Sequence, residues 1–364
     1  MSFLTKLQIN SVRNINNIEL NLDPCLNIIF GINGSGKTSI LESIHLLATG
    51  RSFRTPKTEL IIGEARAELT IYAENELQSR IGLSKGRNTK HKLKLDSKLQ
   101  RNWELVARAL PVQIVSAITF LLLEGGPKSR RMFLDWGVFH VKQSFVQDWR
   151  ATKKCIANRN LLLKERRIDA SQLEAWNEEL CLYSDRVDEA RREYFREFGP
   201  VFRKVYDSLV PDASAESISI EYWRGWHEDW SLKEILLAEK ERDHRYGSTQ
   251  NGPHRADLRV KAGKKMASDV LSRGQQKILV CALKIAQGVH HASSSGDKCI
   301  YLIDDLPAEL DEENRANILK YLDGLGSQLL ITGVELPSIV NCLSDDAEKR
   351  TFHVERGTIK DSLL

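Results

Sequence analysis

The chain has 364 residues, of which 41% are apolar and 28% are charged. This composition is typical of a folded protein with two or three domains of roughly 150 residues each, and it excludes a largely disordered chain. The net charge is only +4, so any contact with nucleic acid must depend on local basic patches.

No segment of the chain has the pattern of a membrane span or a secretion signal. The apolar runs are far shorter than the roughly 18–20 residues of a membrane-spanning helix, and the N-terminal stretch MSFLTKLQIN lacks an apolar core. The six cysteines are scattered without a CxxC motif, which is typical of thiols in a reducing compartment. We therefore expect a cytoplasmic protein that does not cross a membrane.

The hydrophobic pattern divides the chain into three blocks. Residues 1–115 alternate strand-like runs with one strong helix that starts near Lys37, residues 116–249 are mostly helical, and residues 250–364 return to an α/β pattern. We expect strands at Lys6–Asn10, Leu26–Phe30, Ala67–Ala73, Lys92–Leu95, Cys299–Ile303 and Gln328–Thr332. The two C-terminal runs are short and continuously apolar, which favours a parallel sheet covered by helices.

The helical block carries a heptad-like stripe of apolar residues. Its members are spaced alternately by three and four positions: Leu173, Trp176, Leu180, Tyr183, Val187, Ala190 and Tyr194. Gly199-Pro200 interrupts this stripe, and we expect a bend there. Residues 173–209 would span only about 55 Å as one helix. The stripe favours a helical lobe packed on itself over a projecting arm.

The most specific motif fits the pattern GxxxxGK[ST] between an apolar strand and a helical run. Its residues are Gly31, Ile32, Asn33, Gly34, Ser35, Gly36, Lys37 and Thr38. The glycines allow backbone N–H groups to surround a phosphate, and the following helix adds partial positive charge. We expect Lys37 to reach the β- and γ-phosphates of ATP and the Thr38 hydroxyl to bind Mg²⁺.

Two adjacent acids follow the apolar run Cys299–Ile303. On a strand neighbouring the phosphate loop, Asp304 would hold Mg²⁺ through water, and Asp305 would orient or deprotonate the attacking water. Two acids after a strand can also cap the next helix. The phosphate loop favours the metal and catalytic interpretation.

A third motif, Leu271–Gln276, reads Leu-Ser-Arg-Gly-Gln-Gln and opens a helix. It is similar to the signature of ABC and SMC ATPases, in which the serine of one subunit caps the γ-phosphate held by another. Ser272 is the matching serine and the third catalytic candidate. A serine at a helix start is also an ordinary N-cap, but the order of the three motifs favours the signature.

The chain resembles the RecF family over essentially its full length. Four stretches carry the resemblance: Arg13–Ile15, Gly50–Thr55, Gly125–Asp135 and Gly252–Leu258. The resemblance implies an α/β fold, an ABC/SMC-like P-loop ATPase head with an inserted helical lobe. In such a fold residues 1–115 and 250–364 form the head and residues 116–249 form the lobe. It also adds Arg13 to the nucleotide-binding residues.

The resemblance further implies a function in DNA replication, recombinational gap repair and SOS induction. A protein of this kind binds ATP and Mg²⁺, forms an ATP-dependent homodimer on single-stranded or gapped DNA, and aids RecA loading with RecO and RecR. This chain departs from related patterns in two places. Ala117-Ile118 replaces a proline and an acid, and Thr332-Gly333 stands where ABC and many SMC heads have a switch histidine.

Without that histidine, and with Asp305 in place of the longer glutamate, proton handling should be poorly preorganised. We therefore expect a slow, DNA-stimulated ATPase that acts as a switch. A transporter subunit would have the switch histidine and a signature nearer the phosphate loop. A coupled nuclease would need a further acidic cluster, and a small-molecule kinase would lack the signature.

Two stretches could contact DNA. Lys85–Arg101 carries seven basic residues and one acid, and Arg150–Arg167 has the same balance, so each has a net charge of +6. The candidates for DNA contact are Lys90, Lys92, Lys94, Lys153 and Lys154. Either stretch can instead be an ordinary solvated face. No base-reading helix is evident, so we expect binding that is independent of sequence and sensitive to salt.

Overall fold

The computed structural model describes residues 3–64, 66–87, 89–165, 169–211, 218–343 and 349–361. The chain forms two compact units, each built from separate stretches of sequence. The first unit comprises Met1–Phe120, Lys204–Asp212 and Arg273–Leu364, and the second comprises Leu121–Arg203 and Ala213–Ser272.

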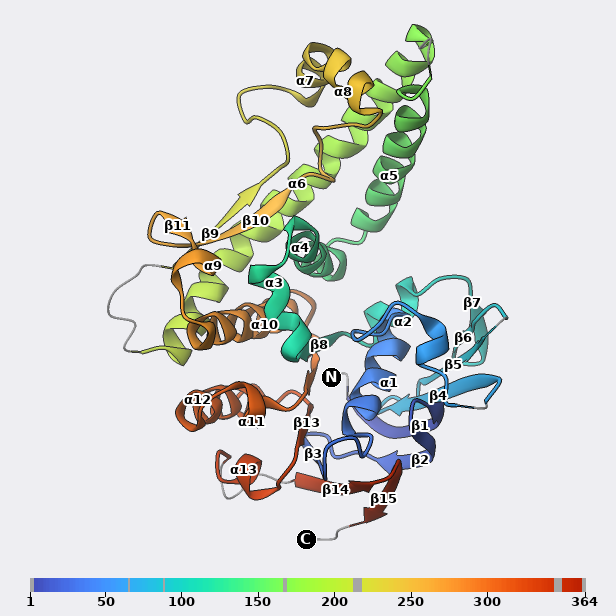
Figure 1. The fold of residues 1–364 in the computed structure, drawn as a ribbon, viewed down its shortest axis with the longest axis vertical. Helices are drawn as coiled ribbons and strands as arrows, with labels where there is room; N and C mark the ends of the chain where they lie inside the picture. The colour runs from blue at the N-terminus through green and yellow to red at the C-terminus, as the bar shows by residue number, and fades with distance from the viewer. Residues whose placement is uncertain are drawn as a thin grey trace. The chain divides into compact units, whose positions relative to one another are not determined.

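The first unit contains a parallel sheet with one antiparallel edge strand (Figure 1). Its strands, in spatial order, are β15 (Thr358–Asp361), β14 (Lys349–Glu355), β3 (Leu26–Phe30), β13 (Leu329–Gly333), β12 (Ile300–Ile303) and β8 (Val112–Val115). Every residue of β8, β12 and β13 is buried, which explains their continuous apolar runs.

An antiparallel sheet forms the other layer of this unit. Its strands, in spatial order, are β2 (Ile15–Asn21), β1 (Leu4–Val12), β4 (Glu68–Asn75), β5 (Arg80–Gly86), β6 (Lys92–Leu95) and β7 (Lys98–Gln100). Buried and exposed residues alternate along most of β2, because one face lies on the core. All six predicted strands are present, with ends shifted by at most two residues.

Helix α1 (Lys37–Thr49) shares one hydrophobic core with both sheets. Its residues Ile40, Leu41, Ile44 and Leu47 pack in the same buried cluster as residues of β1, β5, β12 and β14. The other helices of the first unit are η1 (Thr58–Leu60), α2 (Glu104–Ala109), η2 (Ala117–Phe120), α10 (Arg273–Ser295), α11 (Leu306–Glu309), α12 (Glu312–Asp323) and α13 (Pro337–Val340).

The second unit is mainly helical and also holds a small antiparallel sheet. Its helices are α3 (Leu121–Glu124), α4 (Pro127–Val141), α5 (Phe145–Leu162), α6 (Ala170–Leu209, whose last residues belong to the first unit), α7 (Leu232–Ala238), α8 (Lys240–Tyr246) and α9 (Ala267–Val270). Its sheet has the order β11 (Lys265–Met266), β10 (Asp257–Ala262) and β9 (Ile218–Trp223).

The heptad-like stripe lies on α6. Its residues Leu173, Leu180, Val187 and Tyr194, seven positions apart, are all buried, and Leu180 packs with Cys155 and Trp226 of the same unit. This packing favours a lobe over a projecting arm. The helix continues through Pro200, and the bend expected at Gly199-Pro200 stays a prediction.

The structural division differs from the expected domain boundaries. Residues 250–272, which we expected in the C-terminal part of the head, belong to the second unit. The reason is strand pairing, because β10 pairs along its whole length with β9. The Arg130 guanidinium also donates two hydrogen bonds to the Asp257 carboxylate, at 2.8 and 3.0 Å. Two of the stretches that carry the RecF resemblance thus contact each other.

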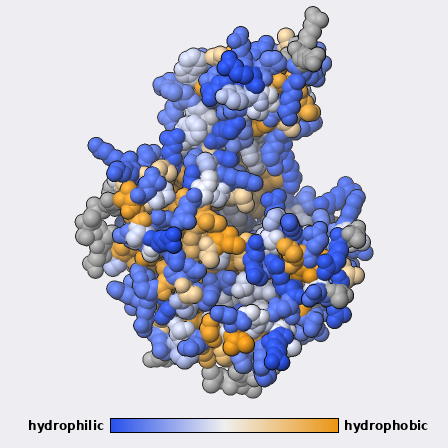
Figure 2. Space-filling view, viewed as in Figure 1, coloured by the Kyte–Doolittle hydropathy of each residue, from blue (hydrophilic) through white to orange (hydrophobic). Residues whose placement is uncertain are grey.

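Figure 2 shows hydrophilic residues over most of the visible surface, with apolar residues in small separate groups. Among the described residues, no helix has the length and hydrophobicity that a membrane crossing requires.

Candidate nucleotide-binding site

The phosphate-loop motif connects β3 to α1. Gly31, Gly34 and Gly36 have φ angles of 146°, 79° and 119°, which side chains with a Cβ rarely adopt. A Cβ on Gly31 would lie 2.3 Å from the Val354 carbonyl oxygen. The loop therefore requires glycine for both its backbone conformation and its close packing.

Lys37 is the first residue of α1 and is only 6% exposed. Its ammonium group donates hydrogen bonds to the carbonyl oxygens of Gly31 at 2.7 Å and Ile32 at 3.0 Å. Burial lowers the pKa of Lys37, and the nearby charges of Asp305 and Asp304 partly oppose this shift. The lysine is thus folded onto its own loop.

Two hydroxyls converge on Asp304. Thr38 and Thr332 each donate a hydrogen bond to Asp304 Oδ1, and both distances are 2.9 Å. Burial raises the pKa of Asp304, and these two bonds only partly lower it again. The strand of Asp304 is not a neighbour of β3, contrary to expectation, because β13 lies between them. Thr332 on that intervening strand completes the cluster.

Asp305 has the left-handed conformation, with φ 51° and ψ 45°. Its backbone N–H donates a 2.9 Å hydrogen bond to the Thr332 hydroxyl. The residue precedes α11, but its side chain makes no capping hydrogen bond. The geometry thus gives no support to the helix-cap interpretation, and Asp305 instead lines the pocket beside the phosphate loop.

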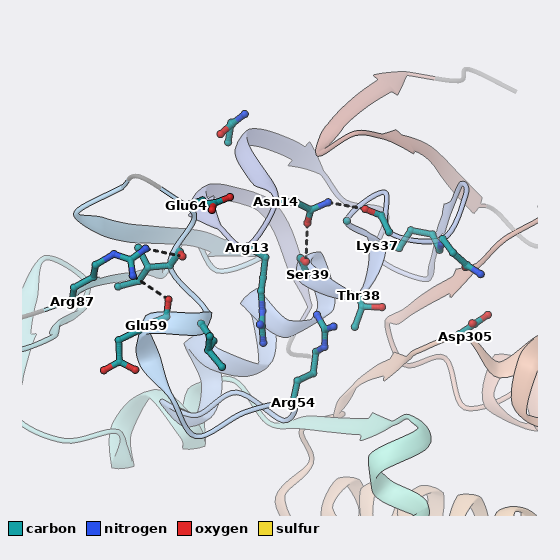
Figure 3. A pocket seen from close by; sticks show the side chains of 16 residues that line it. Arg13, Asn14, Lys37, Thr38, Ser39, Arg54, Glu59, Glu64, Arg87 and Asp305 are labelled. Carbon is teal, nitrogen blue, oxygen red and sulfur yellow. Dashed lines mark hydrogen bonds between the residues drawn. The ribbon is translucent and has the colours of Figure 1, made fainter.

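This pocket has a volume of about 780 Å³ and lies within the first unit. Figure 3 shows Arg13 and Arg54 between Thr38 and the side formed by Glu59 and Arg87. The pocket is lined by Arg13, Asn14, Asn16, Asn33, Gly34, Gly36, Lys37, Thr38, Ser39, Arg54, Glu59, Leu60, Ile62, Glu64, Arg87 and Asp305.

Asn14 connects the loop to its helix, because its amide donates to the Gly34 carbonyl at 2.9 Å and its oxygen accepts from the Ser39 hydroxyl at 3.2 Å.

Sequence reasoning missed Glu42, which positions two arginines at the pocket. Its fully buried carboxylate accepts two hydrogen bonds from Arg13, at 2.9 and 2.8 Å, and one from the Ser52 hydroxyl. It also forms an ion pair with Arg54 at 3.5 Å. Burial raises the pKa of Glu42, but the bonds from Arg13 and Ser52 outweigh it, so the net pKa is lowered. A single acid in an apolar helix was the available signal, since buried charges need partners.

The residues present fit Mg²⁺ and a phosphate chain. Mg²⁺ is bound by few protein oxygens, and the Thr38 hydroxyl and the Asp304 carboxylate already meet at one point. The Ser35 hydroxyl is buried and has no hydrogen-bond partner among the described residues. A buried polar group without a partner is costly, and a phosphate oxygen would satisfy it.

Ser272 does not line this pocket. It is exposed and directly precedes α10. An exposed position at a helix start is what capping of another subunit's nucleotide requires.

The basic stretches are less uniform than their composition predicts. Lys90, Lys92 and Lys94 are exposed, as are Lys153 and Lys154 on α5. Two other members are used within the fold. Arg87 donates hydrogen bonds to the carbonyls of Glu59, Ile62, Gly63 and Arg66. Arg159 is fully buried against Asp243, while Arg166 and Arg167 lie outside the described residues.

The family model for the RecF/RecN/SMC N-terminal domain matches residues 3–360. A DNA replication and repair protein RecF from Pseudomonas syringae pv. tomato is 41% identical over 98% of this chain and 97% of its own. The chain belongs to the RecF family of DNA replication and repair proteins. A further RecF, from Azotobacter vinelandii, is 42% identical over 98% of each chain.

Solved structures agree on the fold of this RecF-family member. A structure of the recombination mediator protein RecF with ATP, from the RecFOR pathway, has a TM-score of 0.86 and 24% identity, covering 100% of this chain and 98% of that one. An Smc head domain from Pyrococcus furiosus has a TM-score of 0.59 and 16% identity, covering 100% and 96%. The expected ABC/SMC-like ATPase head is thus confirmed.

Proposed function

We propose that this chain is an ATP-dependent DNA-binding switch of cytoplasmic replication and recombinational repair. One observation carries the proposal. Lys37, Thr38, Asp304, Asp305 and Thr332, which come from three separate stretches of sequence, are joined by hydrogen bonds or charge interactions in one cluster beside a large polar pocket.

Four members of the cluster act on the ligands in this proposal, and Thr332 holds Asp304 in place. The loop N–H groups and Lys37 hold the phosphates, and Thr38 and Asp304 hold Mg²⁺, which supplies charge neutralisation on the phosphate oxygens. Asp305 orients the attacking water from its fixed left-handed position. Arg13 and Arg54, held by Glu42, add positive charge to the same pocket.

Turnover should be slow, because Gly333 occupies the position at which a switch histidine would act. Asp305 also stands in place of the longer glutamate, so proton handling should be poorly preorganised. A slow hydrolytic step suits a timer that keeps the protein on DNA for a limited period. Hydrolysis at hundreds of turnovers per second without DNA would contradict this part of the proposal.

Two copies of the chain would share the triphosphates, with Ser272 of each capping the nucleotide of the other. Its position before α10 and its exposure support this role. Single-stranded and gapped DNA, RecO and RecR are the proposed partners, with RecA loading and SOS induction as the outcome. Membership in a family of DNA replication and repair proteins supports this assignment.

The test is to measure the molecular mass of the full chain in solution with and without ATP and Mg²⁺. The wild type should dimerise only with ATP, whereas Lys37→Met and Ser272→Arg should stay monomeric. Ser293→Arg, at the exposed far end of α10, is the matched control and should dimerise. A wild type that remains monomeric with saturating ATP, yet binds DNA normally, would overturn the proposed mechanism.

A further inference from the structure

A second pocket lies within the first unit and has a volume of about 390 Å³. The loop that follows α1 forms most of it, and β5 supplies the remaining wall. Its lining residues are Gly50, Arg51, Ser52, Phe53, Thr55, Pro56, Ile61 and Lys85. The proposed ATP site does not bind its ligands through this pocket, although Ser52 in its lining bonds to Glu42 and Arg54 of the same loop faces that site.

The charge of the lining is entirely positive. It includes Arg51 and Lys85 and no carboxylate, whereas the ATP pocket mixes cations with Asp305, Glu59 and Glu64. Neither Arg51 nor Lys85 has a side-chain ion pair or hydrogen bond among the described residues. A pocket lined by unpaired cations selects anions.

Lys85 lies on the same face of β5 as the buried residues Ile81 and Leu83. Burial lowers its pKa, and no charge in the surroundings offsets that shift. A half-buried ammonium without a partner is unfavourable. An anion in the pocket would remove this cost.

Lys92 and Lys94 lie on the other face of the sheet. They alternate with Leu93, which pairs with Leu83 and is buried. The basic stretch predicted as one patch is therefore divided between two faces, and Lys85 belongs to the face of the pocket.

The loop is held in one conformation at its start. Gly50 ends α1 with φ 74°, and a Cβ there would lie 2.6 Å from the Trp103 ring. The Trp103 indole N–H donates to the Leu47 carbonyl at 3.0 Å. The indole therefore fixes the point at which the loop leaves the helix.

The middle of the loop is fixed by Ser52. Its hydroxyl accepts the N–H groups of Arg54 at 2.9 Å and Thr55 at 3.1 Å and bonds to the buried Glu42. The Thr55 hydroxyl accepts the Lys57 N–H at 3.2 Å and donates to no described residue. A cation on each wall and a free hydroxyl proton thus surround a preformed space.

We propose that this pocket binds a phosphate group of the nucleic-acid backbone, with Lys85 and Arg51 as the charged ligands and Thr55 as a hydroxyl donor. This inference rests on the proposed DNA-binding function and names one site for it. The contact carries no base information, because its ligands are charges and a hydroxyl directed at phosphate.

The test measures the affinity of the full chain for fluorescent single-stranded and duplex oligonucleotides over a series of salt concentrations. Each lost phosphate contact lowers the slope of log K against log salt by about 0.9 for duplex and about 0.7 for single strands. The double variant Arg51→Ala/Lys85→Met removes both cations from the one phosphate and should show this full reduction, whereas Lys85→Met or Arg51→Ala alone should show part of it. Lys57→Ala removes the same charge close by but outside the pocket, and its slope should match the wild type.

Two further measurements separate the possible explanations. Lys85→Met should keep ATP affinity and should not lower the melting temperature, because it removes an unpaired, half-buried charge. A rise in the melting temperature of the wild type with added inorganic phosphate would identify a site for free anions. Unchanged slopes for DNA binding would overturn the inference, whether or not inorganic phosphate stabilises the protein. A wild type that does not bind DNA would overturn the proposed function as well.

Discussion

At the scale of single residues, Thr332 joins the two acids of the site. Its hydroxyl donates to Asp304 and accepts the N–H of Asp305, both at 2.9 Å. Thr332→Val removes both bonds at nearly constant volume. We expect kcat for ATP hydrolysis to fall by about 10–100-fold, as when other groups that orient metal ligands are removed, with KM for ATP nearly unchanged. Thr332→Ser should restore kcat, and a large rise in KM alone would contradict this role.

Asp304 makes stability depend on pH. Its folded pKa is raised above 3.8 by burial, so the carboxyl favours folding when protonated and opposes it as the pH rises through the folded pKa. Asp304→Asn removes the cost of burying the ionised carboxylate. The nucleotide-free variant should melt higher than the wild type at pH 7, by about 2–4 °C for each kcal/mol, and the difference should shrink towards pH 3.8.

Calorimetry or thermal melting over this pH range measures the effect. Mg²⁺ and ATP should stabilise the wild type and give much less stabilisation to Asp304→Asn. A variant that melts lower at neutral pH without nucleotide would contradict the prediction.

The residues of the phosphate-loop motif were easier to predict than the residues that hold the site in place. The glycines and Lys37 have a fixed spacing that reflects phosphate geometry. Glu42 and Thr332 act through contacts between separate elements, and no local pattern records such contacts. Arg159 shows the converse error, because its place in a basic stretch concealed its burial against Asp243.

At the scale of elements, two helical glycines have opposite surroundings. A Cβ on Gly199 of α6 would meet no atom within 4 Å, whereas a Cβ on Gly137 of α4 would lie 2.2 Å from the Tyr194 ring. Gly137→Ala should therefore destabilise the protein by about 1–3 kcal/mol. Gly199→Ala adds no such clash, but a Cβ in helical conformation directly before Pro200 is disfavoured. It should therefore cost less than Gly137→Ala and bring less than the gain of about 1 kcal/mol that glycine-to-alanine gives inside a helix. Denaturant unfolding gives both values, and equal effects would contradict this interpretation of the packing.

Strands with short apolar runs were predicted well, because burial on both faces leaves a clear pattern. Whether α6 continues through Pro200 could not be decided from the sequence, and the structure shows that it does. Buried residues on both sides of that position, Phe198 and Phe202, supply packing that offsets the lost backbone hydrogen bond. Local propensity alone could not show this compensation.

At the scale of the whole molecule, the boundary after residue 272 depended on pairing between distant strands. The helical block and the stretch that contains β10 have different hydrophobic patterns. Strand β10 nevertheless pairs with β9, beginning with Asp257 opposite Trp223, and this pairing joins the two stretches in one sheet. The hydrophobic pattern returns to an α/β pattern near residue 250 and therefore suggested an earlier boundary. The fold of the head, by contrast, was predicted from the order of the three ATPase motifs together with the resemblance to the RecF family.

The lifetime of the proposed ATP-bound dimer tests the role of Asp305 on this scale. Asp305→Asn keeps the size of the side chain but removes the carboxylate that orients water. We expect its ATP-bound dimer to persist at least about tenfold longer than the wild-type dimer after free ATP is diluted, as followed by light scattering. Lys37→Met is the control without a dimer. Equal lifetimes would show that hydrolysis at Asp305 does not control dissociation.

Lys37 meets its ligand with two hydrogen bonds already made. Its ammonium group donates to two carbonyl oxygens of its own loop, and each hydrogen bond to a charged group contributes about 1.5–3 kcal/mol. A ligand that draws the ammonium away from these carbonyls has to supply oxygens in their place. We therefore expect adenosine, which carries no phosphate oxygen, to compete poorly with ATP for this loop.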